Sequence, residues 1–203
     1  MELQLSQQQI LLKNTIEKLC LDYCSLENLR QIEDTKKGFS DEFWNQLVNL
    51  GLTGINIPSE FGGSEMGLLD QVIVYEEFGR SLSLSPHLTS SIICSYLINK
   101  LGSTSQKEEI LPLIASGELI ITLAWLEEGS SFFKNGINLN LTKKGKKYFL
   151  DGKKHMVPYA SEANKILVLC KDKGCITAAI VDSKDEGITY TYQENHANTS
   201  MYE

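Results

Sequence analysis

The chain has 203 residues, of which 42% are hydrophobic and 22% charged, an ordinary globular composition with enough apolar material for a core. Its 26 acidic residues outnumber its 19 basic ones and give a formal net charge of -7, a balance that argues against nucleic-acid binding. The first residues are polar, and no apolar run reaches the length of a membrane span, so we expect a cytoplasmic protein without membrane contact.

The residues that most often bind metals are scattered. None of the five cysteines has a partner at the short spacing of a zinc knuckle, and the three histidines are isolated in the sequence. We therefore expect no metal site and interpret the cysteines as buried, reduced thiols.

The chain up to Gly117 has the periodicity of helices. Ser6 and Gln9 are spaced as a capping box, which predicts a first helix directly after Ser6. Further helices are expected after Ser40, over 68–80, over 86–101 and from 103 onward. Pro112 should break the last of these into two short pieces.

After Gly117 the pattern changes to short apolar runs of strand length. Turns are expected around Gly145 and at Asp172–Gly174, and Asp151–Gly152 predicts a two-residue hairpin. The fold class is therefore α+β: an all-α domain, residues 1–117, followed by an antiparallel β-barrel or sandwich, residues 118–203. This second domain looks incomplete, so we expect an unpaired edge and a chain that self-associates or needs a partner.

Four stretches of the sequence resemble one known family. They are Phe43–Leu52, Ile57–Gly63, Tyr75–Arg80 and Gly102–Glu118. In this order and at this spacing they are similar to the amino-terminal part of the acyl-CoA dehydrogenase family, and the resemblance covers nearly the whole chain. We interpret most of these motifs as structural, with Gly62–Gly63 permitting a tight turn.

Two further stretches resemble the family's flavin-contacting motifs, with departures. In Leu123–Phe132, Glu127 matches the glutamate of the family's Thr-Glu-Pro, while Leu126 and Glu128 stand in place of the threonine and the proline. Asp151–Tyr159 is similar to Asn-Gly-x-Lys-x-Trp-Ile-Thr-Asn. There, Lys154 matches, but Met156 replaces the tryptophan and Pro158 the threonine.

The resemblance implies FAD as cofactor and an acyl-CoA or other acyl thioester as substrate. The positions that it places against the flavin are Leu123, Trp125, Leu126, Met156, Val157 and Pro158. Those that it places against the substrate are Ser130 and Ser131.

The departures remove two hydrogen-bonding groups from the expected flavin site. Leu126 has no hydroxyl, and Pro158 has neither a hydroxyl nor a backbone N–H. At about 1 kcal/mol for each lost hydrogen bond, FAD binding would weaken roughly ten- to a hundredfold. Trp125, Met156 or Tyr159 could instead rebuild an apolar platform for the ring, and Trp125 and Tyr159 could equally be ordinary core and rim aromatics.

The family reaction is an α,β-dehydrogenation, and the resemblance places its catalytic glutamate in a carboxy-terminal helix bundle beyond residue 203. No residue of this chain is therefore assigned a catalytic role, and Glu127 is interpreted as solvated. Two hypotheses stay open. The chain is a portion of an oxidoreductase that acts in a homo- or hetero-oligomer with a partner chain, or it is a degenerate, flavin-free family member that acts as a binding or regulatory subunit.

Overall fold

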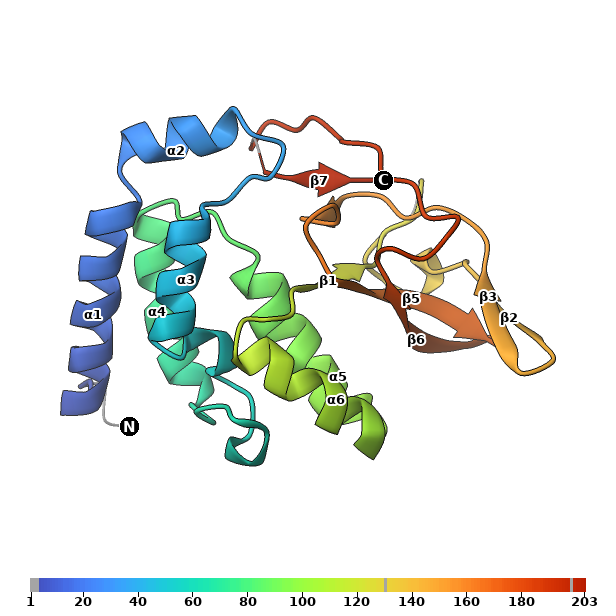
Figure 1. The fold of residues 1–203 in the computed structure, drawn as a ribbon, viewed down its shortest axis with the longest axis horizontal. Helices are drawn as coiled ribbons and strands as arrows, with labels where there is room; N and C mark the ends of the chain where they lie inside the picture. Colours follow the sequence, from blue (N-terminus) through green and yellow to red (C-terminus); the bar gives the residue numbers. More distant parts are fainter. Residues whose placement is uncertain (1–3, 130, 198) are drawn as a thin grey trace. The chain divides into compact units, whose positions relative to one another are not determined.

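The computed structural model describes residues 4–129, 131–197 and 199–203. The chain divides into two compact units, Met1–Glu118 and Leu119–Glu203, whose elements are labelled in Figure 1. The first unit is helical and the second is built from short strands that form a partial, mostly antiparallel sheet region. This confirms the predicted α+β class, and the strands of the described residues do not close into a barrel.

The helical unit contains α-helices and short helices of other types. The α-helices are α1 (Gln7–Tyr23), α2 (Leu26–Glu33), α3 (Asp41–Asn49), α4 (Leu68–Arg80), α5 (Ser95–Leu101) and α6 (Thr104–Ala115). Two 3₁₀-helices, η1 (Leu52–Gly54) and η2 (Ser59–Phe61), and one π-helix, η3 (Leu88–Cys94), lie between them. The predicted capping box is present: Gln9 N donates to Ser6 Oγ over 3.2 Å, and Ser6 N to Gln9 Oε1 over 3.0 Å.

One helix prediction was wrong, and one helix was missed. Pro112 lies inside α6 and does not break it. Ile110, Leu111 and Ile114 are buried on both sides of the proline, and this burial offsets the one backbone hydrogen bond that proline removes. The helix expected over 86–101 is present, as a π-helix followed directly by α5, whereas α2 was not predicted.

The π-helix is supported by side chains that bind its carbonyl groups. Ser95 Oγ donates to Ser91 O over 2.6 Å, and Asn56 Nδ2 donates to Ile92 O over 3.2 Å. A π-turn displaces carbonyls from the regular helical ladder, so these polar side chains satisfy groups that would otherwise lie buried without partners.

The core of the helical unit forms between α1, α3, α4 and α6, and α1 packs along α4 (Figure 1). Ile16, Leu47 and Leu111 are fully buried. His87 is buried with them, and both of its ring nitrogens have partners: Nδ1 lies 2.7 Å from the Tyr75 hydroxyl and Nε2 lies 2.9 Å from Leu52 O. Burial lowers the pKa of His87 to about 4, although the bond to the Leu52 carbonyl acts in the opposite direction.

The glycines after η2 have the tight role that the sequence predicts. Gly62 has a left-handed φ of 80°. A Cβ on Gly63 would lie 2.0 Å from Ile57 O, so the backbone could not approach this closely with any other residue.

The β unit consists of short strands in three small sheets. Its strands are β1 (Ile121–Ala124), β2 (Leu141–Lys144), β3 (Lys147–Leu150), β4 (Val157–Pro158), β5 (Lys165–Asp172), β6 (Cys175–Asp182) and β7 (Met201–Tyr202), with the short helix η4 (Lys134–Gly136) before β2. One sheet has the order β1-β5-β6, with β1 parallel and β6 antiparallel to β5, while β2 pairs with β3 and β4 with β7, both antiparallel.

The hairpin predicted at Asp151–Gly152 was wrong, while the other two turns were right. The chain turns at Gly145, between β2 and β3, and at Lys173–Gly174, between β5 and β6. After β3 it continues to β4, which pairs with β7 and not with β3. A two-residue hairpin needs strands that pair on both sides of it, and no such pairing follows Gly152 among the described residues.

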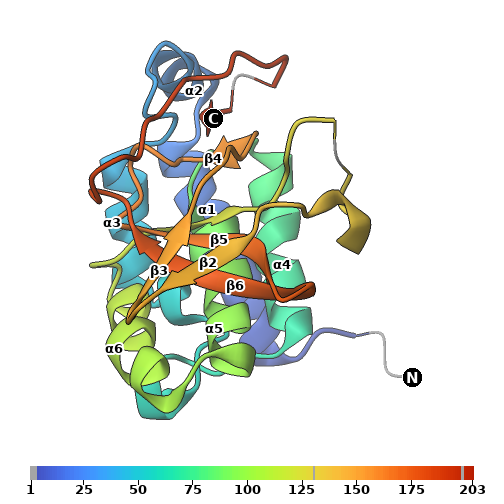
Figure 2. The same ribbon diagram turned by 90° about the vertical axis from the view of Figure 1, so that its right-hand side faces the viewer.

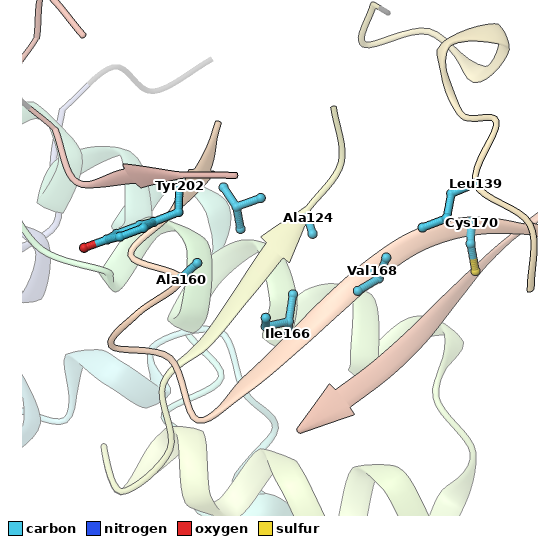
Figure 3. Close-up of a cluster of buried hydrophobic side chains, with 8 residues drawn as sticks. Ala124, Leu139, Ala160, Ile166, Val168, Cys170 and Tyr202 are labelled. Atoms are coloured by element: carbon cyan, nitrogen blue, oxygen red, sulfur yellow. The ribbon is translucent and has the colours of Figure 1, made fainter. Parts of the chain in front are cut away.

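One core cluster of the β unit lies on one side of β5. Ile166, Val168 and Cys170 project from that side toward Ala124 of β1 and Leu139, and Tyr202 and Ala160 extend the cluster at one end (Figure 3). Leu167 points to the opposite side and is buried too, so apolar side chains are buried on both faces of β5.

An open groove of about 830 Å³ lies between the β1-β5-β6 sheet and the β2–β3 hairpin. Figure 2 shows the hairpin lying across that sheet. Apolar side chains line it from both sides, among them Leu141, Leu150, Val168 and Val181. β6 is the last strand of its sheet in the part of the chain that the structure describes, and Ile176 on it is 46% exposed.

Candidate functional site

The two segments that carry the expected flavin positions lie side by side. The end of β1 and the two residues after it, Trp125 and Leu126, run next to the segment that contains β4. His155 N donates to Leu126 O over 2.9 Å in an antiparallel bridge, and the Thr122 hydroxyl donates to the Pro158 carbonyl. The structure thus brings together two motifs that are about thirty residues apart in the sequence.

A partly buried ion pair supports this arrangement. Lys154 Nζ lies 2.7 Å from Glu127 Oε1, with side-chain exposures of 8% and 13%, and it also donates to Trp125 O over 3.1 Å. The same carboxylate accepts hydrogen bonds from the backbone N–H groups of Asn138, at 2.9 Å, and Leu139, at 3.0 Å. The sequence context of Glu127 suggested a solvated side chain, and this interpretation was wrong. The side chain is mostly shielded from water, and these donors replace the water that it loses.

The electrostatics of Glu127 follow from these contacts. Burial alone would raise the pKa of its carboxyl group, but the hydrogen bonds from Lys154 and from the Leu139 and Asn138 amides hold the pKa below its ordinary value. The carboxylate is thus ionised at neutral pH and engaged by Lys154 and the two backbone amides, which leaves it unsuited to act as a general base.

The six expected flavin positions differ in how accessible they are. Leu123 and Val157 are buried, and Val157 belongs to the core cluster of the β unit. Trp125, Leu126 and Pro158 are half-buried, and Met156 is 40% exposed. A ligand could therefore contact the last four directly, whereas Leu123 and Val157 support the surface from below.

Two residues around β4 have unusual backbone conformations. Met156 and Tyr159 both have a φ of 53°, in the left-handed region that residues other than Gly, Asn and Asp rarely adopt. Tyr159 stands where the motif quoted above has asparagine. Its side chain is buried, and burial raises the pKa of its hydroxyl to about 12, so Tyr159 is a core residue and not part of the accessible surface.

The expected substrate residues lie in the loop between Glu127 and Asn138. Ser130 lies outside the described residues, and Ser131 is exposed. Phe132, which was assigned no role from the sequence, is 65% exposed and packs edge-on against Trp125 with ring centroids 5.5 Å apart. Gln193 was missed as well: its Oε1 accepts the Met156 N–H over 2.7 Å. In the sequence, the adjacent aromatic residues Phe132 and Phe133 are a feature that could have indicated a role for this loop.

Other kinds of site find little support in the described ranges. They contain no group of three or more His, Cys, Asp or Glu side chains that could hold a metal ion. Of the helices in these ranges, none is long and apolar enough to cross a bilayer.

Comparison with known proteins identifies the family. Residues 6–118 match the family model of the acyl-CoA dehydrogenase N-terminal domain. The mitochondrial isovaleryl-CoA dehydrogenase of Pongo abelii is 34% identical over 172 residues, which cover 82% of this chain and 40% of the relative.

Two solved structures share the fold. One is the ChsE4-ChsE5 complex of Mycobacterium tuberculosis, with a TM-score of 0.84 and 23% identity over 95% of this chain and 52% of the other. The second is a glutaryl-CoA dehydrogenase of Mycobacterium smegmatis in complex with FADH2, with a TM-score of 0.87 and 18% identity over 98% of this chain and 52% of the other. The chain thus spans about half the length of the proteins it matches, or somewhat less. On this evidence the chain belongs to the acyl-CoA dehydrogenase family.

Proposed function

We propose that this chain is a portion of an acyl-CoA-dehydrogenase-type flavoenzyme, an oxidoreductase of fatty-acid metabolism that acts on an acyl-CoA or other acyl thioester. In this proposal residues 1–117 are its helical domain and residues 118–203 its β-domain portion. The observation that carries it is the junction of the two flavin motifs around Glu127 and Lys154, because one matching residue from each motif contributes to a single ion pair.

The residues at this junction fit the flat face of a flavin ring. Trp125, Leu126, Met156 and Pro158 offer apolar side chains that a planar ring can cover. Trp125 Nε1 is buried without a hydrogen-bond partner, which makes it a donor that a polar ring edge could satisfy once the Phe132 ring moves. FAD, when bound, would supply hydride acceptance from the β-carbon of the acyl group.

The remaining parts of the proposal follow from the family. Ser131, and Ser130 before it, would lie on the substrate side. The proton-abstracting base would come from a partner chain in a homo- or hetero-oligomer, and the named complex of two ChsE proteins is an example of a family-fold assembly. A cytoplasmic location is part of the same proposal.

One observation favours a second candidate, a flavin-free member that acts as a binding or regulatory subunit. Leu126 and Pro158 offer no side-chain donor, and the Met156 N–H is already bound by Gln193. A flavin ring would then leave polar edge atoms unpaired, which weakens binding.

Equilibrium dialysis of the chain against FAD separates the two candidates. The flavoenzyme proposal expects a yellow protein with saturable FAD binding. It further expects that Met156→Lys weakens this binding at least about tenfold, because the cation removes part of the apolar face. Ile176→Lys is the matched control, since Ile176 is similarly exposed on β6. A chain that stays colourless at high FAD concentration would refute the proposal for this chain and support the flavin-free candidate.

A further inference from the structure

The carboxylate of Glu127 holds three segments of the β unit together. It receives Lys154 from the segment before β4, and it receives the Asn138 and Leu139 N–H groups from the chain just before β2. Lys154 returns a hydrogen bond to the carbonyl of Trp125, two residues before Glu127. The end of β1, the segment before β4 and the chain before β2 are thus tied to one side chain.

These contacts also close the loop 128–137. Glu127 stands at its start, and the two amides that the carboxylate accepts stand directly after its end. The loop carries Ser131 and Phe132, and Phe132 packs on Trp125. The carboxylate therefore ties both ends of this loop to the two motif segments.

We propose that Glu127 and Lys154 are positioning residues, which hold the end of β1, the loop 128–137 and the segment 154–158 at the spacing that FAD requires. This inference rests on the proposed function and extends it. Neither residue contacts the ring: they preform the surface made by Trp125, Leu126, Met156 and Pro158. A site held in advance loses less conformational freedom on binding, so its affinity depends on the residues that hold it.

Other contacts keep the segments together when the ion pair is removed. The bridge between Leu126 and His155 and the Thr122–Pro158 hydrogen bond do not involve either charged side chain. Variants of the pair should therefore fold with the segments adjacent but less precisely spaced, which makes the inference testable in folded protein.

The test compares stability with FAD affinity. Lys154→Met leaves a partly buried carboxylate without its cation, so it should lower both the melting temperature and the FAD affinity, the latter at least about tenfold. The double variant Glu127→Gln/Lys154→Met buries no lone charge, so it should recover most of the melting temperature. Its FAD affinity should stay at least about tenfold below that of the wild type, because the shared carboxylate is still missing.

The sequence provides matched controls. Glu128 and Lys153 are the exposed neighbours of the pair, and Glu128→Gln and Lys153→Met should leave the FAD dissociation constant unchanged. If the double variant regains FAD affinity together with its melting temperature, the ion pair is purely structural and the inference is wrong.

A readout without FAD separates this inference from the proposed function. Glu127→Gln should speed hydrogen exchange of the Asn138 and Leu139 amides at least about tenfold and shift the emission of Trp125, as the loop with Phe132 loosens. If the wild-type chain binds no FAD, the proposed function fails, while faster exchange still supports the role of Glu127 in holding these segments. Unchanged exchange at both amides overturns the inference whether or not FAD binds.

Discussion

Both units of the chain bury polar atoms that have no hydrogen-bond partner, but in the β unit these atoms lie at the candidate site. In the helical unit, Glu77 Oε1, Ser83 Oγ and Ser91 Oγ are buried without a partner, whereas both nitrogens of the enclosed His87 ring have one. In the β unit, Trp125 Nε1 and His155 Nε2 are buried without one. Both lie at or next to the candidate site, where Met156 and, beside it, Tyr159 adopt left-handed conformations. Unpaired polar atoms and strained residues that gather in one place are typical of a site kept for binding at some cost in stability.

The largest expected effect tests whether the helical unit has the tighter core. Leu47→Ala removes a fully buried side chain of α3 and should lower the free energy of unfolding by about 3 kcal/mol. Leu141→Ala, at the open groove of the β unit, should cost only about 1 kcal/mol because the cavity it leaves is open to water. Native-state hydrogen exchange on peptides from each unit measures both. If both substitutions lowered the free energy of unfolding equally, the helical unit would not have the tighter core.

The next effect is a dependence of the helical unit on pH. The pKa of His87 is about 4 in the fold, below its ordinary value of 6.5, so the unfolded chain binds the proton more readily between these values. The contribution of His87 to stability is complete above pH 6.5 and falls as the pH drops, by about 2 kcal/mol at pH 5. Urea unfolding at a series of pH values should show this loss in the wild type. In His87→Gln the stability should stay nearly flat over the same range, and an equal loss in that variant would contradict the assignment.

The smallest effect separates strain in a turn from strain at the candidate site. Lys173, with a φ of 50°, and Gly174 form the two-residue turn between β5 and β6, so Lys173→Asn should stabilise the β unit by up to about 1 kcal/mol. Met156→Asn should relieve similar strain. Only Met156→Asn should weaken FAD binding, because only Met156 belongs to the apolar surface. Thermal unfolding and dialysis against FAD check the pair, and equal FAD affinity in both variants would remove Met156 from the site.

Much of the fold could be predicted because it depends on local signals. The capping box at Ser6, the glycines at Gly62–Gly63 and the turn at Lys173–Gly174 each act over a few residues, and all three are present. The errors arose where distant packing decides the outcome. Buried neighbours keep α6 intact across Pro112, and pairing with β7 directs the chain after Gly152. Neither effect has a local sequence signal.

The candidate site shows the same division. The two motif stretches could be found in the sequence by their similarity to a family, together with the positions at which they depart from the family's motifs. The partnership of Glu127 with Lys154 could not be read from either motif alone, because it joins residues 27 positions apart through the fold. A signal was nevertheless present: these were residues that still matched the family where their neighbours did not.

The outer edge of β6 has a consequence for how the protein behaves in solution. Its run Ile176–Val181 carries no charge, and its outer edge could pair with another extended chain. The charged residues Lys173, Asp182 and Lys184 lie on either side of this run and oppose such pairing. These side chains oppose fibrillar stacking by repulsion and by their hydration, and dissolved ions shorten the range of the repulsion. Colloidal stability should therefore decline as ionic strength rises, and low-salt buffers should preserve dispersed protein best.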